Sequence, residues 1–166
     1  MKRDVTTEHE GEVSTILHDE ISEGDMINLS APVGGFSIEN TERPQLFIGS
    51  GVGMTPLVSM FKKAASLNVP TQMIQAVVTE DERPFAQKLD SITANHEQAQ
   101  LHLHVKDKEG YLEAKELEQY LSEQPEIYIC GGTNFLHSII NSLKELNYDM
   151  NHVHFETFIP RLSVQV

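Results

Sequence analysis

The residues best suited to chemistry lie in a glycine-rich segment, GSGVGMTP, at positions 49–56. Glycines let a ligand approach the backbone closely, Thr55 is a good N-cap, and Pro56 fits the first helical position. The free N–H groups at a helix start attract phosphate, so the segment predicts a diphosphate site. The spacing is not G-x-G-x-x-G, and a tight strand-to-helix turn without a ligand is the alternative. The predicted binding residues are Gly51, Val52, Gly53, Met54, Thr55 and Pro56.

The elements that must position this segment follow from an alternation of apolar runs and helical spacings after residue 44. Apolar runs predict strands over residues 46–48, 73–78 and 127–130, an alternation of apolar residues with histidine predicts a strand over 101–105, and a final strand is expected over 153–155. Helical spacing predicts helices over residues 56–67, 84–96, 112–121 and 135–146. Strands separated by helices of this length predict an α/β fold, a parallel sheet of about five strands with helices on both faces. Ligands of such sheets bind at the carboxyl ends of the strands, where Cys130 is expected.

The first 43 residues have a different pattern and predict a separate, incomplete domain. A helix-like stretch at 14–20 and an alternating stretch at 26–30 precede a turn at 31–36. So few short elements cannot form a closed sheet. The polar segment 39–44 ends in proline and is typical of a linker. We therefore expect two domains, residues 1–43 and residues 44–166.

Charge and composition exclude several classes of partner. The formal net charge is −13, which repels phosphate backbones and anionic lipid, so neither nucleic acid nor membranes are expected partners. No apolar run approaches the roughly 20 residues that span a bilayer, and the N-terminus does not have the pattern of a secretory signal. Cys130 is the one cysteine, which excludes an internal disulfide and favours a cytoplasmic location.

Two other constellations have a functional and an ordinary interpretation. His102 and His104 share one face of a predicted strand, as do His152 and His154, and the two pairs could together hold a metal ion. We favour half-exposed strand histidines and predict no metal site. The acidic run 80–82 follows the second strand, where a carboxylate can bond a ribose 2′-hydroxyl and repel a 2′-phosphate. It favours NADH over NADPH, with an ordinary acidic loop as the alternative.

Four ordered segments carry a resemblance to a known family. Residues 51–56, GVGMTP, resemble the G-x-G-x-T-P turn in the NAD(P)-binding domain of the ferredoxin-reductase-like family. YICGG at 128–132 resembles the family's Y-x-C-G-P segment, and HFETFIP at 154–160 resembles its C-terminal segment. GEVSTILHD at 11–19 resembles the flavin-domain segment G-x-V-S-x-x-L-H-D. With LSAPVG at 29–34, the chain is most similar to the reductase part of flavohaemoglobins, the nitric oxide dioxygenases.

The resemblance implies roles for particular residues. Ser14 would meet the FAD pyrophosphate at a helix start, with a plain N-cap as the alternative. Cys130, followed by Gly131, would lie near the hydride-carrying carbon of the nicotinamide, with a small buried core residue as the alternative. Glu156 and Phe158 would lie at the flavin, with Phe158 covering its ring. The implied catalytic residues are Cys130 and Glu156.

The resemblance implies an NAD(P)H-binding oxidoreductase module that passes hydride to FAD. The chain departs from the family because it has no R-x-Y-S segment, most of the flavin-binding β-barrel and the globin domain are absent, and Gly132 replaces a proline. Residues 1–43 would then be the C-terminal remnant of the barrel, in a truncated gene product or an expressed fragment. We expect weak or absent FAD affinity, a flavin or electron-acceptor partner, no nitric oxide dioxygenation by this chain alone, and a homo-oligomer. The alternative is a non-catalytic remnant or a nucleotide-binding or interaction module without flavin.

Overall fold

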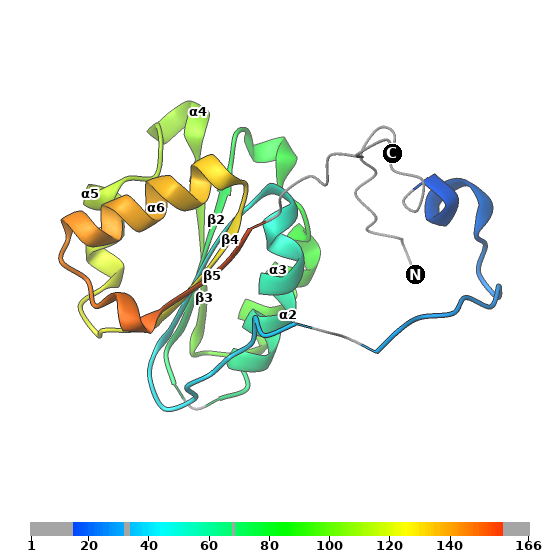
Figure 1. The fold of residues 1–166 in the computed structure, drawn as a ribbon, viewed down its shortest axis with the longest axis horizontal. Coiled ribbons are helices and arrows are strands. Elements are labelled where there is room, and N and C mark those ends of the chain that lie inside the picture. Colours follow the sequence, from blue (N-terminus) through cyan, green and yellow to red (C-terminus); the bar gives the residue numbers. More distant parts are fainter. Residues whose placement is uncertain (1–14, 32–33, 68, 158–166) are drawn as a thin grey trace, which may run out of the picture. The chain divides into compact units, whose positions relative to one another are not determined.

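A computed structural model describes residues 15–31, 34–67 and 69–157, and its contacts divide the chain into units 1–35 and 36–166 (Figure 1). In the first unit, the expected helix-like stretch contains one helical turn, Ile16–Glu20. The alternating stretch at 26–30 forms no regular element, and Met26 is 98% exposed. No helix among the described residues is long and apolar enough to cross a membrane. The assignment of the first unit to a flavin-binding barrel stays a prediction.

The second unit is built on a five-stranded parallel sheet, which confirms the predicted fold class. Its strands are β1 Gln45–Ser50, β2 Thr71–Val77, β3 Ala99–Val105, β4 Glu126–Gly131 and β5 Val153–Thr157. The order across the sheet is β3-β2-β1-β4-β5. The chain therefore adds β2 and β3 on one side of β1 and then adds β4 and β5 on the other side of β1. In open α/β sheets, ligands bind at the carboxyl ends of the strands where the order reverses, and here the reversal lies between β1 and β4.

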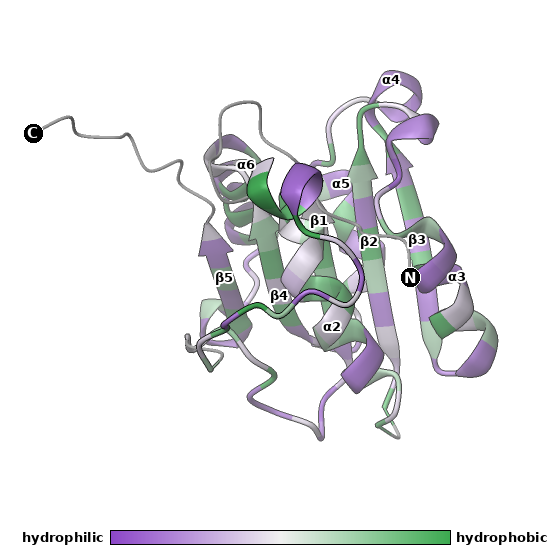
Figure 2. Cartoon of the chain, turned by 90° about the vertical axis from the view of Figure 1, so that its right-hand side faces the viewer, coloured by the Kyte–Doolittle hydropathy of each residue, from purple (hydrophilic) through white to green (hydrophobic). Residues whose placement is uncertain are grey.

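Helices cover both faces of the sheet (Figure 1). Helices α2, Met54–Ala64, and α3, Ala86–Asn95, lie on one face, and α5, Ala114–Leu117, and α6, Thr133–Glu145, lie on the other. A short helix, α4, Lys106–Glu109, follows β3 and is hydrophilic throughout (Figure 2). Because side chains alternate along a strand, Phe47 packs under α2 while Ile48 packs under α6. Two apolar layers thus hold the strands in place.

The helix expected over 112–121 and the segment before β1 both differ from the sequence prediction. The helix expected over 112–121 is shorter, because the Glu113 and Glu116 side chains form a capping box that starts α5 only at Ala114. A 3-10 turn, Glu118–Tyr120, completes the stretch. Residues 36–43, expected in the first domain, belong to the second unit. The Glu39 N–H donates to the Tyr128 hydroxyl at 3.0 Å, and Phe36 packs against the core.

Candidate functional site

In the turn after β1, Gly51 and Val52 are exposed. Ser50 is still extended, and Gly51 then adopts a positive φ of 55°, which reverses the chain into a 3-10 turn, Gly51–Gly53. A Cβ atom at Gly51 would meet no heavy atom within 4 Å. The backbone at Gly51 therefore faces open space. The first N–H groups of a helix have no hydrogen-bond partners within that helix. A phosphate could approach these groups directly.

Gly53 serves a different purpose, which is close packing. A Cβ atom at Gly53 would lie 2.2 Å from the Cys130 carbonyl oxygen and 2.5 Å from the Gly131 nitrogen. The missing side chain lets the start of α2 rest directly on β4. Gly51 therefore makes the turn possible, whereas Gly53 holds the turn against the sheet.

The expected N-cap role of Thr55 is wrong. The chain enters the helical path at Gly51, so α2 already begins at Met54. The Thr55 hydroxyl donates back to the Val52 carbonyl oxygen at 2.8 Å and does not accept an N–H. Pro56 still lies within the first turn of α2, where its missing N–H breaks no helical bond. Contact between the residues of this turn and a phosphate stays a prediction.

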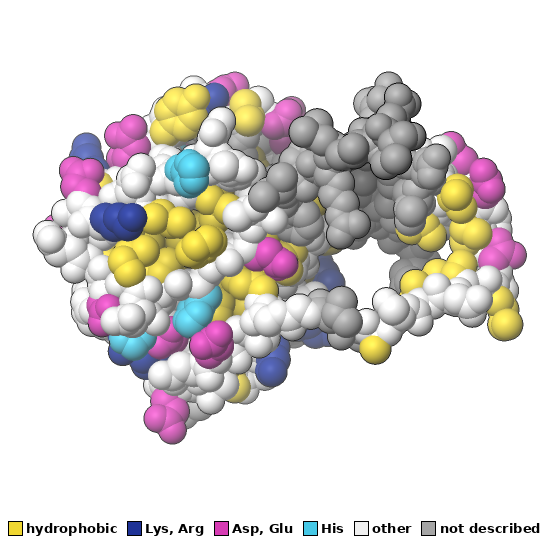
Figure 3. Space-filling model, in the orientation of Figure 1, with side chains coloured by type: hydrophobic (Ala, Val, Ile, Leu, Met, Phe, Trp, Pro, Cys, Tyr) yellow, Lys and Arg dark blue, Asp and Glu magenta, His cyan; other side chains and the backbone are white. Residues whose placement is uncertain are grey.

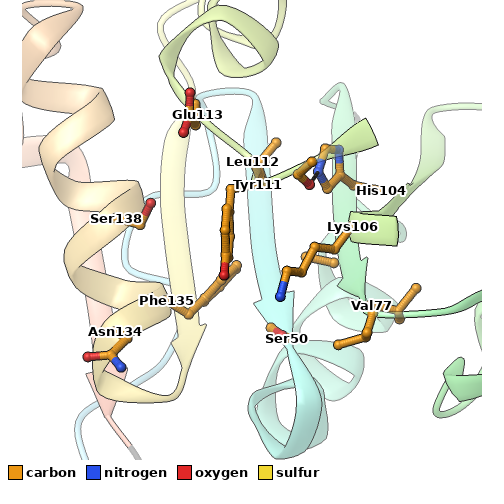
Figure 4. A pocket seen from close by; sticks show the side chains of 13 residues that line it. Ser50, Val77, His104, Lys106, Tyr111, Leu112, Glu113, Asn134, Phe135 and Ser138 are labelled. Carbon is orange, nitrogen blue, oxygen red and sulfur yellow. Dashed lines mark hydrogen bonds between the residues drawn. The ribbon is translucent and has the colours of Figure 1, made fainter. Parts of the chain in front are cut away.

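Beside the turn, a cavity of about 550 Å³ opens at the carboxyl ends of β1, β2 and β3 (Figure 4). One wall is the segment 110–113, and the other is the first part of α6. The Tyr111 and Phe135 rings stand on these two walls, and the Lys106 Nζ lies 4.6 Å from the centre of the Tyr111 ring. The other lining residues are Ser50, Ala76, Val77, Val78, His104, Gly110, Leu112, Glu113, Asn134 and Ser138.

The sequence analysis did not single out Lys106, Tyr111 and Phe135. Each lies after the carboxyl end of a predicted strand, and this position was the sequence signal by which these residues could have been found. No short motif marks them, because the two walls come from separate parts of the chain and meet only in the folded sheet.

Cys130 is fully buried in the core under α2, next to the turn that it supports through Gly53. Burial, and to a smaller extent the Glu156 carboxylate, raise the pKa of the thiol to about 11, although a hydrogen bond with the Gly131 backbone acts in the opposite direction. The thiol is therefore protonated at neutral pH. These surroundings match the alternative of a small buried core residue, and a role beside a nicotinamide would be one of packing.

Glu156 lies on β5, directly across from Cys130 in the strand register, and its side chain is exposed. The fold thus brings together Gly53, Cys130 and Glu156 at one edge of the sheet. The other two implied contacts, Ser14 and Phe158, lie outside the described residues. The catalytic assignment of Cys130 and Glu156 stays a prediction.

The two histidine pairs lie at opposite edges of the sheet, one on β3 and the other at the start of β5, so the alternative of one shared metal site is wrong. His152 and His154 instead bond the buried Glu126 carboxylate, at 2.8 and 2.9 Å. Within the described part of the chain, no group of three His, Cys, Asp or Glu side chains could hold a metal ion. In the acidic run Glu80–Glu82, Glu80 pairs with Lys108 at 2.5 Å, and this pairing holds the pKa of the carboxyl below its ordinary value.

Comparison with known proteins agrees with this geometry. The sequence profile of the oxidoreductase NAD-binding domain matches residues 47–140. A flavohemoprotein of Bacillus cereus is 30% identical over 172 residues, an alignment that covers 94% of this chain and 43% of that protein. Flavohemoprotein B of Dictyostelium discoideum is 28% identical over an alignment that covers 93% of this chain and 40% of that protein. The chain thus spans less than half of these relatives.

A solved structure is also similar to most of the chain. The crystal structure of the flavohem-like FAD/NAD-binding domain of a nitric oxide dioxygenase from Vibrio cholerae superposes with a TM-score of 0.76 at 27% identity. The superposition covers 90% of this chain and 65% of the Vibrio cholerae chain. The profile match runs from β1 into α6 and includes the glycine turn, both cavity walls and Cys130. On this evidence the chain belongs to the oxidoreductase NAD-binding domain family, and it is homologous to the reductase part of flavohemoproteins.

Proposed function

We propose that the chain binds NAD(P)H across the carboxyl ends of β1, β2 and β4 and presents its nicotinamide to a flavin. The observation that carries this proposal is the bare backbone at Gly51 beside a cavity flanked by two aromatic rings. When bound, NAD(P)H supplies a hydride and a flavin can accept it. The residues of this chain hold and orient the dinucleotide.

Each part of a dinucleotide has a fitting surface. The pyrophosphate would lie at Gly51 and Val52, where backbone N–H groups offset the repulsion of a chain with net charge −13. The adenosine would enter the cavity, where Tyr111 is 66% exposed and its ring is available for stacking. The nicotinamide would then point toward Cys130 and Glu156 at the other side of the turn.

Closing the cavity tests this placement. Ser138 lines the cavity from α6, so Ser138→Trp fills space that the adenosine would occupy. We expect the affinity for NADH, measured by isothermal titration calorimetry, to fall by about tenfold or more, equivalent to about 1.4 kcal/mol. His137→Trp, at the neighbouring exposed position of α6, is the matched control and should bind like the wild type. Failure of the wild type to bind at millimolar NADH, or full binding by Ser138→Trp, would contradict the proposal.

We propose NADH as the preferred dinucleotide. The acidic turn Glu80–Glu82 follows β2 and is exposed, so the carboxylates of Asp81 and Glu82 would repel a 2′-phosphate. The ammonium group of Lys106 in the cavity would instead attract a 2′-phosphate. Parallel titrations decide between them: we expect tighter binding of NADH, and tighter binding of NADPH would instead assign Lys106 to the 2′-phosphate.

A nucleotide-binding module without flavin is the second candidate. It is favoured because the described part of residues 1–35 contains one helical turn and no strand, so it offers no described surface that fits a flavin. We propose that FAD binds weakly, and that a flavin carried by a partner accepts the hydride. Flavin absorbance that persists in the purified protein after gel filtration would contradict weak FAD binding.

We also propose a cytoplasmic homo-oligomer. The free buried thiol of Cys130 is compatible with a reducing compartment. Figure 3 shows hydrophobic side chains gathered on the face over α6 and β5, and Phe155 on β5 is 53% exposed. Exposed apolar surface of this kind favours self-association. A monomeric mass in light scattering would contradict the oligomer.

A further inference from the structure

We propose that His104 is a positioning residue that fixes the wall of the cavity on which Tyr111 stands. This inference rests on the proposed placement of the adenosine in that cavity. His104 lies near the carboxyl end of β3, lines the cavity and is only 6% exposed. Its Nε2 is bonded to the Gly110 carbonyl oxygen in the wall, so it would act on the dinucleotide through the wall.

One hydrogen bond links His104 to the wall. Its Nε2 lies 3.0 Å from the Gly110 carbonyl oxygen. Since a carbonyl oxygen only accepts, Nε2 must carry the hydrogen and donate it. The tautomer of the ring is thereby fixed, and in the neutral ring Nδ1 has a free lone pair. Nδ1 lies 3.8 Å from a Glu109 carboxylate oxygen.

The bonded carbonyl belongs to the peptide unit that leads into Tyr111. A peptide unit is planar, so a hydrogen bond to the Gly110 oxygen also fixes the direction in which the Tyr111 backbone begins. Gly110 has φ 82° and ψ −161°, a conformation that a glycine adopts readily, and the chain therefore depends on outside contacts to hold it. Lys106 then packs over the Tyr111 ring, as Figure 4 shows from close by.

The other contacts of this segment lie within or beside α4, and they include the hydrogen bond that the Gly110 N–H donates to the Lys106 carbonyl oxygen at 2.8 Å. The Asp107 N–H donates to the Val78 carbonyl oxygen at 3.1 Å, and a Glu109 carboxylate oxygen accepts the Val105 N–H at 2.8 Å. The Lys108 ammonium pairs with Glu80. These contacts anchor residues 107–109 to the ends of β2 and β3. The His104 bond acts one residue further on, at the point where the wall of the cavity begins.

Two substitutions separate positioning from simple packing. His104→Gln keeps a side-chain N–H that can reach the Gly110 oxygen, whereas His104→Leu keeps bulk and removes the donor. His102→Leu is the matched control: it lies on the same strand and the same face, bonds Gln72 at 3.1 Å and does not line the cavity. The probes are ADP-ribose, which contains the adenosine, and nicotinamide mononucleotide, which does not.

We expect His104→Leu to weaken ADP-ribose binding about fivefold, the loss that one hydrogen bond typically produces. His104→Gln should restore most of it, and nicotinamide mononucleotide should bind all variants equally. Unchanged ADP-ribose binding by His104→Leu, or equal losses for both ligands, would overturn the positioning role and leave the proposed function standing. If wild-type protein fails to bind ADP-ribose, the cavity is not the adenosine site and both proposals fail together.

Discussion

Gly53→Ala should be among the most damaging single substitutions in this protein, lowering the free energy of unfolding by about 3 kcal/mol. The added methyl carbon would lie 2.2 Å from the Cys130 carbonyl oxygen, and a backbone atom in a central strand cannot move aside as a side chain can. The start of α2 must therefore lift from β4. Since the same movement displaces the turn at Gly51, affinity for NADH should fall as well. Urea unfolding followed by circular dichroism measures the first effect, and calorimetric titration measures the second.

Two other glycines give graded controls for this prediction. Gly132→Ala adds a methyl group where no heavy atom lies within 4 Å and the backbone φ is −68°, so little change is expected. Gly51→Ala also has open space, but it places a side chain at φ 55°, which is expected to destabilise by about 1 kcal/mol. A Gly53→Ala protein as stable as Gly132→Ala would show that α2 does not rest on β4 in the way described.

Glu126→Gln should lower the free energy of unfolding by about 3 kcal/mol at pH 7, because it removes one partner of a buried charged network. Glu126 begins β4, and its side chain is 4% exposed. It accepts hydrogen bonds from His152 and His154 at 2.8 and 2.9 Å, and the Arg43 Nε lies 3.6 Å away. A neutral amide retains the shape of the carboxylate but leaves the Arg43 charge without its partner.

The same network predicts how stability depends on pH. Burial by itself raises the pKa of the Glu126 carboxyl, but the hydrogen bonds and charges of His154 and His152 outweigh burial and lower it. The pKa in the folded protein is thus below that in the unfolded chain, so the unfolded state binds the proton more readily. This contribution is fully present above the ordinary glutamate pKa and is lost as the pH falls through the lowered value.

Unfolding measured between pH 7 and pH 3 tests this dependence. The stability of the wild type should fall more steeply below about pH 5 than that of Glu126→Gln, because the variant has lost this titration. Glu123→Gln, an exposed substitution in the turn before β4, is the matched control and should follow the wild type. If the free energy of unfolding fell equally steeply with falling pH for Glu126→Gln and for the wild type, this carboxylate would not be a stabilising anion.

The sheet could be predicted from the sequence because its signal is local. All five strands overlap the predicted segments. The inner strands β1, β2 and β4 are buried along most of their length and are apolar at most positions, whereas the edge strands β3 and β5 are more exposed and alternate apolar with polar side chains. The helices were located by their apolar spacing, and their ends were less accurate, as α5 shows. Its start depends on the capping box between Glu113 and Glu116, which the apolar spacing does not show.

The glycine turn after the first strand of a parallel sheet, and its suitability for a phosphate, could both be predicted from the sequence. Residue type and chain order were enough, because the turn is made by neighbours. The role of each residue in the turn became apparent from its contacts in the folded protein. Position 53 must be a glycine because the Cys130 backbone, far along the chain, lies against it. The cavity forms because the segment after β3 and the start of α6 meet above β1. Contacts between distant segments leave no pattern in either segment alone, so they become visible only when the sheet is assembled.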